Sequence, residues 1–155
     1  MGGQQFCTHG LLLDMRVYKK IIHFDRNLGH LKVESGLMWP ELIEFLHVEQ
    51  QEDPTPWAIR QKQTGVDEVT IGGSMAANIH GRGLNYKPFI DDIDSFDLVD
   101  AAGEIRHCSR EENQGLFSLV IGGYGLFGVV TQVTIKLIPR QKVKRLVEVI
   151  AVKNF

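Results

Sequence analysis

The sequence is poor in cysteine, in long apolar runs and in net charge. Its two cysteines, Cys7 and Cys108, lie far apart, which excludes a disulfide framework and a CxxC redox site. The longest apolar runs, such as Leu116–Ile121, are far shorter than the roughly 20 residues that span a bilayer, so no transmembrane segment is expected. With 17 basic against 19 acidic residues and no basic cluster, the chain is not expected to bind nucleic acid.

These absences also bear on location and organisation. The first ten residues have neither the basic nor the apolar region of a secretory signal, and unpaired cysteines favour a reducing compartment. We therefore expect a cytoplasmic protein. A length of 155 residues, 43% of them hydrophobic, predicts one globular domain. The sequence leaves the oligomeric state open.

Glycine is the residue type that stands out. The 16 glycines are about a tenth of the chain, against a usual share of roughly 7%. Most of them fall in three groups: Gly2 and Gly3; Gly72, Gly73, Gly81 and Gly83; and Gly122, Gly123, Gly125 and Gly128. Glycine allows positive φ and a close approach of the main chain to a ligand. Three such groups in one small domain suggest a ligand that the backbone itself holds.

The first half of the chain predicts strands, a helix and a glycine-rich loop. Strands are expected at Gly10–Met15, Lys19–Asp25 and His30–Glu34, followed by a helix that starts near Pro40. A further strand is expected over 66–73. A short helix over 74–79, with Ser74 near its N-cap, would then offer free N–H groups to an anion.

The second half predicts a hairpin over Ser95–Ser109, a helix over Arg110–Gly123 and a strand over Val129–Pro139. Alternation over 142–152 predicts the start of another element. Strands and helices do not alternate regularly, which favours an α+β fold over a doubly wound parallel sheet.

Two motifs each have two interpretations. Gly123–Gly128 matches GxGxxG, but a helix precedes it and a strand follows, the reverse of the dinucleotide-binding order. We interpret it as a tight turn or as a backbone contact with a different cofactor. The segment Thr70–Gly83 is either a loop packed on a sheet or a ligand loop, and its His80 is either a structural residue or a functional one.

No metal site is predicted. The histidines lack ligand spacing, and the acidic run lacks the glycine and glutamate of an EF-hand loop. We interpret this run as a solvated strand edge; its members are Asp91, Asp92, Asp94, Asp97 and Asp100.

Taken in order, three stretches resemble the FAD-binding, PCMH-type domain of the vanillyl-alcohol oxidase superfamily. Met1–Phe6 looks like the end of the pyrophosphate loop, and Thr64-Gly65 together with Thr70–Gly83 looks like the second flavin-contacting segment. Gly122–Pro139 looks like the family's glycine-rich turn and long strand. The resemblance implies the C-terminal portion of this α+β domain, with a mixed or antiparallel sheet and flanking helices.

The resemblance also implies site residues. Those expected at the FAD pyrophosphate are Gly2, Gly3 and Gln4. Those expected at the phosphates and ribityl chain are Gly65, Thr70 and Gly73. Those expected along the isoalloxazine or its linker are Ala77, Asn78, Ile79 and His80, and the adenine is expected at the backbone of Val129 or Val130. No catalytic base is identified.

For organisation, the resemblance implies an FAD-binding domain over 1–140 that lacks its N-terminal strands, and the start of a truncated substrate domain over 141–155. Asn78–Arg82 looks most like bacterial enzymes such as decaprenylphosphoryl ribose oxidase and the aldonolactone and alditol oxidases. This implies an FAD-dependent oxidoreductase that oxidises a sugar, polyol or lactone hydroxyl of a small-molecule substrate by hydride transfer to flavin. The alternatives are a non-catalytic truncated binding module and a nicotinamide-dependent dehydrogenase resting on Gly123–Gly128.

Overall fold

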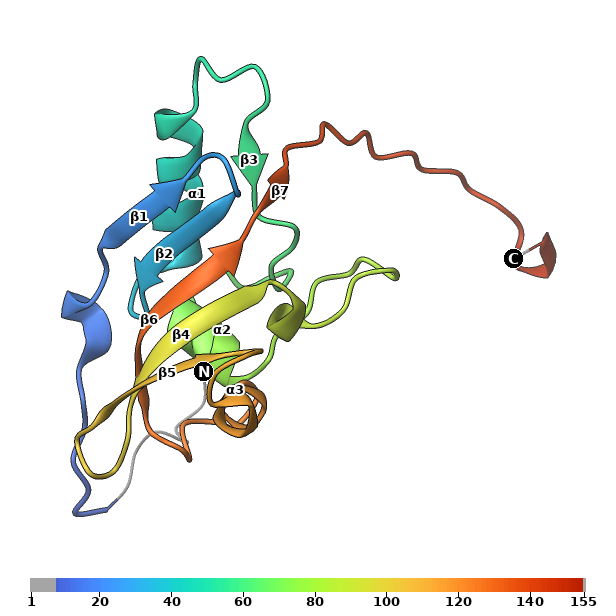
Figure 1. The fold of residues 1–155 in the computed structure, drawn as a ribbon. Helices are drawn as coiled ribbons and strands as arrows, with labels where there is room; N and C mark the ends of the chain where they lie inside the picture. Colours follow the sequence, from blue (N-terminus) through green and yellow to red (C-terminus); the bar gives the residue numbers. More distant parts are fainter. Residues whose placement is uncertain (1–7, 155) are drawn as a thin grey trace.

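The computed structural model describes residues 8–154, and its centre is a five-stranded antiparallel sheet (Figure 1). The strands lie in the order β1-β2-β6-β4-β5. Their bounds are β1 Ile21–Asp25, β2 His30–Glu34, β4 Ile93–Val99, β5 Ile105–Ser109 and β6 Val129–Lys136. The last of these strands in the chain is thus inserted at the centre of the sheet. This arrangement confirms the α+β class.

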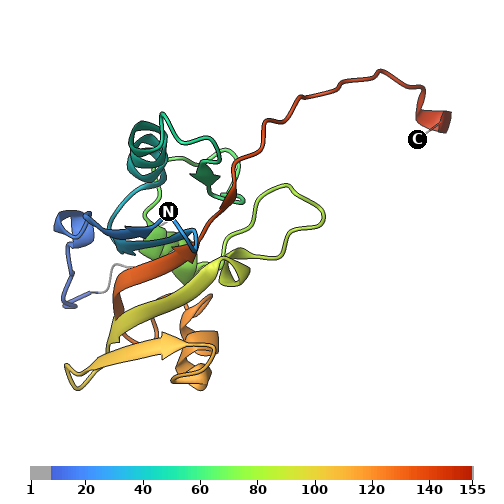
Figure 2. The ribbon, with the colours of Figure 1, turned by 45° about the horizontal axis from the view of Figure 1, so that its top comes forward.

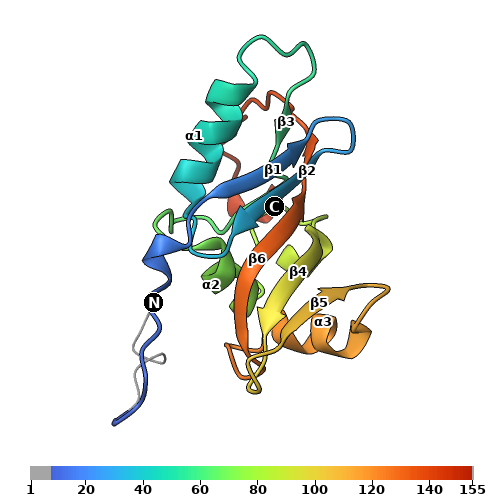
Figure 3. The same cartoon turned by 60° about the vertical axis from the view of Figure 1, so that its left-hand side comes forward.

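Three helices and a small second sheet complete the fold. The helices are α1 Trp39–Glu49, α2 Ile71–Ala76 and α3 Gln114–Val120. Figure 3 shows α1 and α2 on one side of the sheet, while α3 lies beside β5. The second sheet pairs β3 (Trp57–Ala58) with β7 (Ile138–Pro139). No helix among residues 8–154 is long and apolar enough to cross a membrane.

Local signals explain the elements that the sequence predicts correctly. The turn between β1 and β2 is closed by Asp25, whose Oδ1 accepts the N–H groups of Asn27 and Leu28 at 2.9 and 3.0 Å. Pro40 lies in the first turn of α1, where its missing N–H costs nothing. The Glu41 carboxylate accepts the Met38 N–H at 3.1 Å and begins that helix.

The core joins the helices to one face of the sheet. The Trp39 ring of α1 packs edge-on against Phe89 at 5.4 Å, and its indole N–H donates to Ser74 Oγ of α2 at 2.8 Å. On β4, the Phe96 ring stacks on Phe117 of α3 at 5.7 Å. These contacts fix α2, and with it the glycine-rich segment, against the sheet.

Two predicted strands are wrong. Residues 10–14 form no strand; they run exposed into a single 3-10 turn at Met15–Val17, because the chain offers them no partner strand within the described part. Residues 66–69 are irregular as well. Within that predicted strand only Thr70 makes an isolated bridge, to Met38, and α2 begins directly after it.

The second half of the chain differs from prediction in three places. The helix after the hairpin begins only at Gln114, because Asn113 takes a left-handed φ of 49°. Residues 140–151 form no strand and leave the sheet as an exposed segment (Figure 1). The acidic run is not a solvated edge, because β4 lies inside the sheet and Asp92 is only 2% exposed.

Candidate functional site

The second glycine-rich group is built on α2. Its first three N–H groups already have acceptors: the carbonyls of Leu37 and Ser35 at 2.8 Å, and Thr70 Oγ1 at 3.0 Å. The predicted helix start at Ser74, with free N–H groups for an anion, is therefore wrong. The cap is Thr70, and the neighbouring chain satisfies the start of the helix.

Beyond α2 the chain reverses at Asn78. Ala77 ends the helix, and Asn78 follows with a φ of 44°. The Asn78 Oδ1 accepts the N–H of Ile90 at 3.0 Å, so this side chain is engaged within the fold. Ile79 is only 7% exposed and belongs to the core, whereas His80 is exposed. Among the four residues predicted along the isoalloxazine, Ile79 is therefore the one whose side chain is buried in the core and is not available at the surface.

The third glycine-rich group packs directly against the second. Gly122, Tyr124 and Gly125 take φ values of 86°, 51° and 80°, which bend the chain sharply after α3. Within this bend the Gly122 N–H donates to Met75 O and the Tyr124 N–H donates to Ala76 O, each at 3.0 Å. The two groups, distant in the sequence, lie side by side.

The strand β6 begins immediately after this bend. Val129 and Val130 pair with Val99 and Leu98 of β4 and are half-buried. Because α3 precedes Gly123–Gly128 and β6 follows, the strand–turn–helix order of a dinucleotide-binding fingerprint is not present at this motif.

Some main-chain donors in the segments that flank α2 and in the glycine bend remain unused. The N–H groups of Gly65, His80 and Gly125 make no hydrogen bond within residues 8–154. A Cβ built on Gly65 or Gly125 would have no neighbour within 4 Å, and both glycines have positive φ. Open main-chain donors beside small residues suit FAD, because its pyrophosphate is an anion and its rings are flat. Gly2, Gly3 and Gln4 lie outside the described residues.

A partly buried ion-pair cluster braces the segment before α2. Arg60 Nη1 lies 2.8 Å from Asp91 Oδ2 and 3.0 Å from Asp92 Oδ1. Burial raises the pKa of the Asp92 carboxyl above its usual value, and the Arg60 guanidinium opposes that shift. Arg60 thereby ties the segment to the turn that leads into β4.

Gln61 is a site residue that the sequence does not predict. Its Oε1 accepts the Gly81 N–H at 3.0 Å, and its Nε2 donates to Lys87 O at 2.5 Å. The two ends of the loop after His80 therefore meet on one side chain. No motif marks this residue, since the contact joins positions 20 residues apart.

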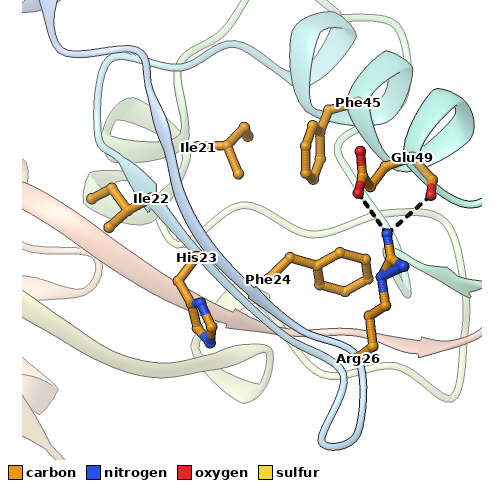
Figure 4. Close-up of a pocket in the computed structure, with 7 residues that line it drawn as sticks. All are labelled: Ile21, Ile22, His23, Phe24, Arg26, Phe45 and Glu49. Carbon is orange, nitrogen blue, oxygen red and sulfur yellow. Dashed lines mark hydrogen bonds and ion pairs between the residues drawn. The ribbon is translucent and has the colours of Figure 1, made fainter.

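A groove of about 410 Å³ lies elsewhere, between β1 and α1 (Figure 4). Its lining residues are Ile21, Ile22, His23, Phe24, Arg26, Phe45 and Glu49. Arg26 Nη2 lies 2.6 Å from Glu49 Oε1 at one end of it. The groove contains none of the predicted site residues.

Comparison with known proteins gives consistent matches. A family model described as "FAD binding domain" matches residues 1–109. Cytokinin dehydrogenase 10 of Oryza sativa subsp. japonica is 32% identical over 148 residues, which cover 90% of this chain and 26% of that protein. Cytokinin dehydrogenase 9 of the same plant is 34% identical over a match that covers 96% of this chain and 28% of that protein. An uncharacterized oxidoreductase, ORF5 in the fasciation locus of Rhodococcoides fascians, is 30% identical, covering 87% and 29%. The chain spans between a quarter and a third of each of these three relatives.

Proposed function

This chain belongs to the FAD-binding domain family of flavin-dependent oxidoreductases, and on that premise we propose that it is the FAD-holding part of a dehydrogenase. The observation that carries the proposal is the direct contact between α2 and the glycine bend, through the Gly122 and Tyr124 N–H groups. The chemistry supplied by bound FAD is acceptance of a hydride from the substrate. This chain's part is to bind and orient.

Each segment has a proposed role in binding. Gly65 offers its unused N–H to the phosphates and ribityl chain, and Gly73 lets them approach because it has no side chain, while its own N–H donates to Thr70 Oγ1 at 3.0 Å. Ala77 and His80 lie toward the flavin ring, and Asn78 and Ile79 contribute only main chain there, because Asn78 Oδ1 and the Ile79 side chain are engaged in the fold. The remaining assignments are Gly2, Gly3 and Gln4 at the pyrophosphate and Val129 or Val130 at the adenine.

We extend the proposal to domain organisation and substrate. Residues 1–140 form the FAD-binding unit, and 141–155 belong to a substrate domain, which is supported by the exposure of residues 141–153 beyond β7. The names of the relatives favour a cytokinin as the substrate of the whole protein over the sugar or polyol hydroxyl expected from Asn78–Arg82. The test is reduction of an electron-accepting dye by the whole protein, with a polyol or a cytokinin as the electron donor. Reduction with the polyol but not with the cytokinin would reverse this choice.

Flavin retention tests the proposal. The purified chain is incubated with FAD and desalted, and the flavin absorbance that remains is measured. Gly73→Asp is expected to weaken retention at least about tenfold, because a carboxylate beside a pyrophosphate is repelled by like charge. Gly73 is exposed in the first turn of α2, and a Cβ built there would meet Thr70 Oγ1 at 3.1 Å and Val69 Cγ1 at 3.7 Å, so the Thr70 side chain must shift by a few tenths of an ångström to admit it.

Gly115→Asp is the matched control, since Gly115 is an exposed glycine of α3 with no heavy atom within 4 Å of a built Cβ. It is expected to retain flavin like the unsubstituted chain. Equal retention by both variants contradicts the loop assignment. A chain that retains no flavin at all favours the non-catalytic module.

A further inference from the structure

We propose that Gln61 is a positioning residue, which clamps the loop 81–87 and thereby orients His80. Its role at the flavin rests on the proposed function, but the clamp itself does not. The loop projects from the body between α2 and β4 (Figures 1 and 2), and residues 82–88 are all exposed, with Leu84 fully so. A loop of this kind keeps one shape only if its two ends are held together.

The base of the loop is closed by main-chain and side-chain hydrogen bonds. The Phe89 N–H donates to Ile79 O at 2.8 Å, and the Ile90 N–H donates to Asn78 Oδ1 at 3.0 Å. These two bonds stop at the base, and they leave the first and last residues of the loop without a direct link.

Gln61 supplies that link. Its single amide accepts from the Gly81 N–H at 3.0 Å and donates to Lys87 O at 2.5 Å, so both donor and acceptor are needed. The approach is close: a Cβ at Gly81 would lie 2.7 Å from Gln61 Oε1 and 3.0 Å from Lys62 O. Glycine at this position is what admits the glutamine side chain.

The clamp reaches His80 through Gly81. The His80 Nδ1 lies 2.9 Å from the Gly81 carbonyl oxygen, which can only accept, so the neutral ring carries its proton on Nδ1. The bare Nε2 of this exposed residue is then a proton acceptor beside α2. Arg60 fixes the main chain next to Gln61 through its ion pairs with Asp91 and Asp92, so the clamp has a rigid base.

Two measurements on the FAD-free chain test the clamp. Imidazole ¹⁵N shifts of His80, assigned with His80→Asn, report the share of the Nδ1–H tautomer. Trypsin reports loop opening by cleavage after Arg82. The other basic residue of the loop, Lys87, is followed by Pro88, and trypsin cleaves such a peptide bond poorly. Gln61→Ala is expected to lower the share of the Nδ1–H tautomer and to speed cleavage at Arg82 about tenfold, because the first and last residues of the loop, Gly81 and Lys87, each lose a hydrogen bond.

A conservative variant separates the clamp from general destabilisation. Gln61→Glu keeps the size of the side chain but loses the donor at neutral pH. It is expected to behave like Gln61→Ala there. With each cleavage rate taken relative to the unsubstituted chain at the same pH, Gln61→Glu is expected to return toward a ratio of one when acidification protonates the carboxyl, whereas Gln61→Ala is not. Gln63→Ala is the control, because the Gln63 side chain makes no hydrogen bond in residues 8–154.

The outcomes are distinct. Faster cleavage with a lost tautomer in Gln61→Ala, and recovery of Gln61→Glu on acidification, support the clamp. Unchanged cleavage and tautomer in a folded Gln61→Ala overturn it, even if the chain retains FAD. If the chain retains no FAD but the clamp results hold, the proposed function fails and the clamp stands.

Discussion

Removing the Ser74 hydroxyl tests how firmly α2 is tied to the core. Ser74 and Trp39 are 0% and 1% exposed, and the indole N–H donates to Ser74 Oγ at 2.8 Å. Ser74→Ala leaves that N–H buried without an acceptor, because water cannot reach it. An orphaned buried donor costs roughly 1–3 kcal/mol, so we expect about 2 kcal/mol of lost stability. For a chain of this length that is a fall in Tm of about 4–8 °C.

A double-mutant cycle isolates the hydrogen bond from the packing. Trp39→Phe removes the donor, but it also loses ring volume against Phe89, whose centroid lies 5.4 Å from that of Trp39. It is therefore expected to cost more than Ser74→Ala. The double variant has neither donor nor acceptor. Its loss of unfolding free energy should therefore be smaller than the sum of the losses in the two single variants, by about 1 kcal/mol or more.

The assay is urea unfolding followed by far-ultraviolet circular dichroism. Ser118→Ala is the control, because Ser118 is an exposed residue of α3 with no hydrogen bond of its side chain in the described part. That change is expected to stabilise the helix slightly, by at most about 0.5 kcal/mol. A loss of less than about 0.5 kcal/mol in Ser74→Ala, or additive costs in the cycle, would refute the reasoning.

Two further predictions concern the glycine bend and the polar face of the sheet. Gly122→Ala and Gly103→Ala both place a side chain at positive φ, 86° and 83°, so each is expected to lose about 1–2 kcal/mol in urea unfolding. Only Gly122→Ala should also lose flavin, and equal flavin retention would contradict the site. Burial raises the pKa of Asp97, but hydrogen bonds from His107 and Lys32 outweigh it and leave the pKa below its usual value. The ionised Asp97 therefore stabilises the fold fully above its unfolded pKa near 4, and this stability is lost as the pH falls through its lower folded pKa. In Asp97→Asn, the urea midpoint should therefore fall less steeply with decreasing pH below about pH 5 than in the unsubstituted chain. An equally steep fall in both contradicts this.

Elements with a local signal could be predicted from the sequence. Pro40 marks the start of α1, and Ala102 with Gly103 marks the turn between β4 and β5. The alternation over Val129–Pro139 corresponds to β6 and β7. In each case the residues that determine the element lie within it, so a short window of sequence contains the whole cause.

The start of α2 could not be predicted in this way. The stretch before Thr70 has a strand-like composition, yet it forms no strand, and within residues 8–154 only Thr70 at its end makes a bridge, to Met38. What begins the helix is a pair of carbonyls, of Ser35 and Leu37, which accept the N–H groups of the first turn. Those carbonyls belong to the link between β2 and α1, and only the folded chain brings them to α2.

The candidate site likewise depends on contacts between segments that are distant in the sequence. Glycine spacing predicts which segments take part, but their contact requires β6 to enter the sheet between β2 and β4. That insertion carries the bend at Gly122 onto Met75, where the Gly122 and Tyr124 N–H groups are used and the Gly125 N–H remains unused. Gln61 depends on the fold even more, because an ordinary polar residue acquires its role only where Gly81 lets it approach. Composition therefore identifies the segments of such a site, and the non-local strand order determines which groups within them are free to bind.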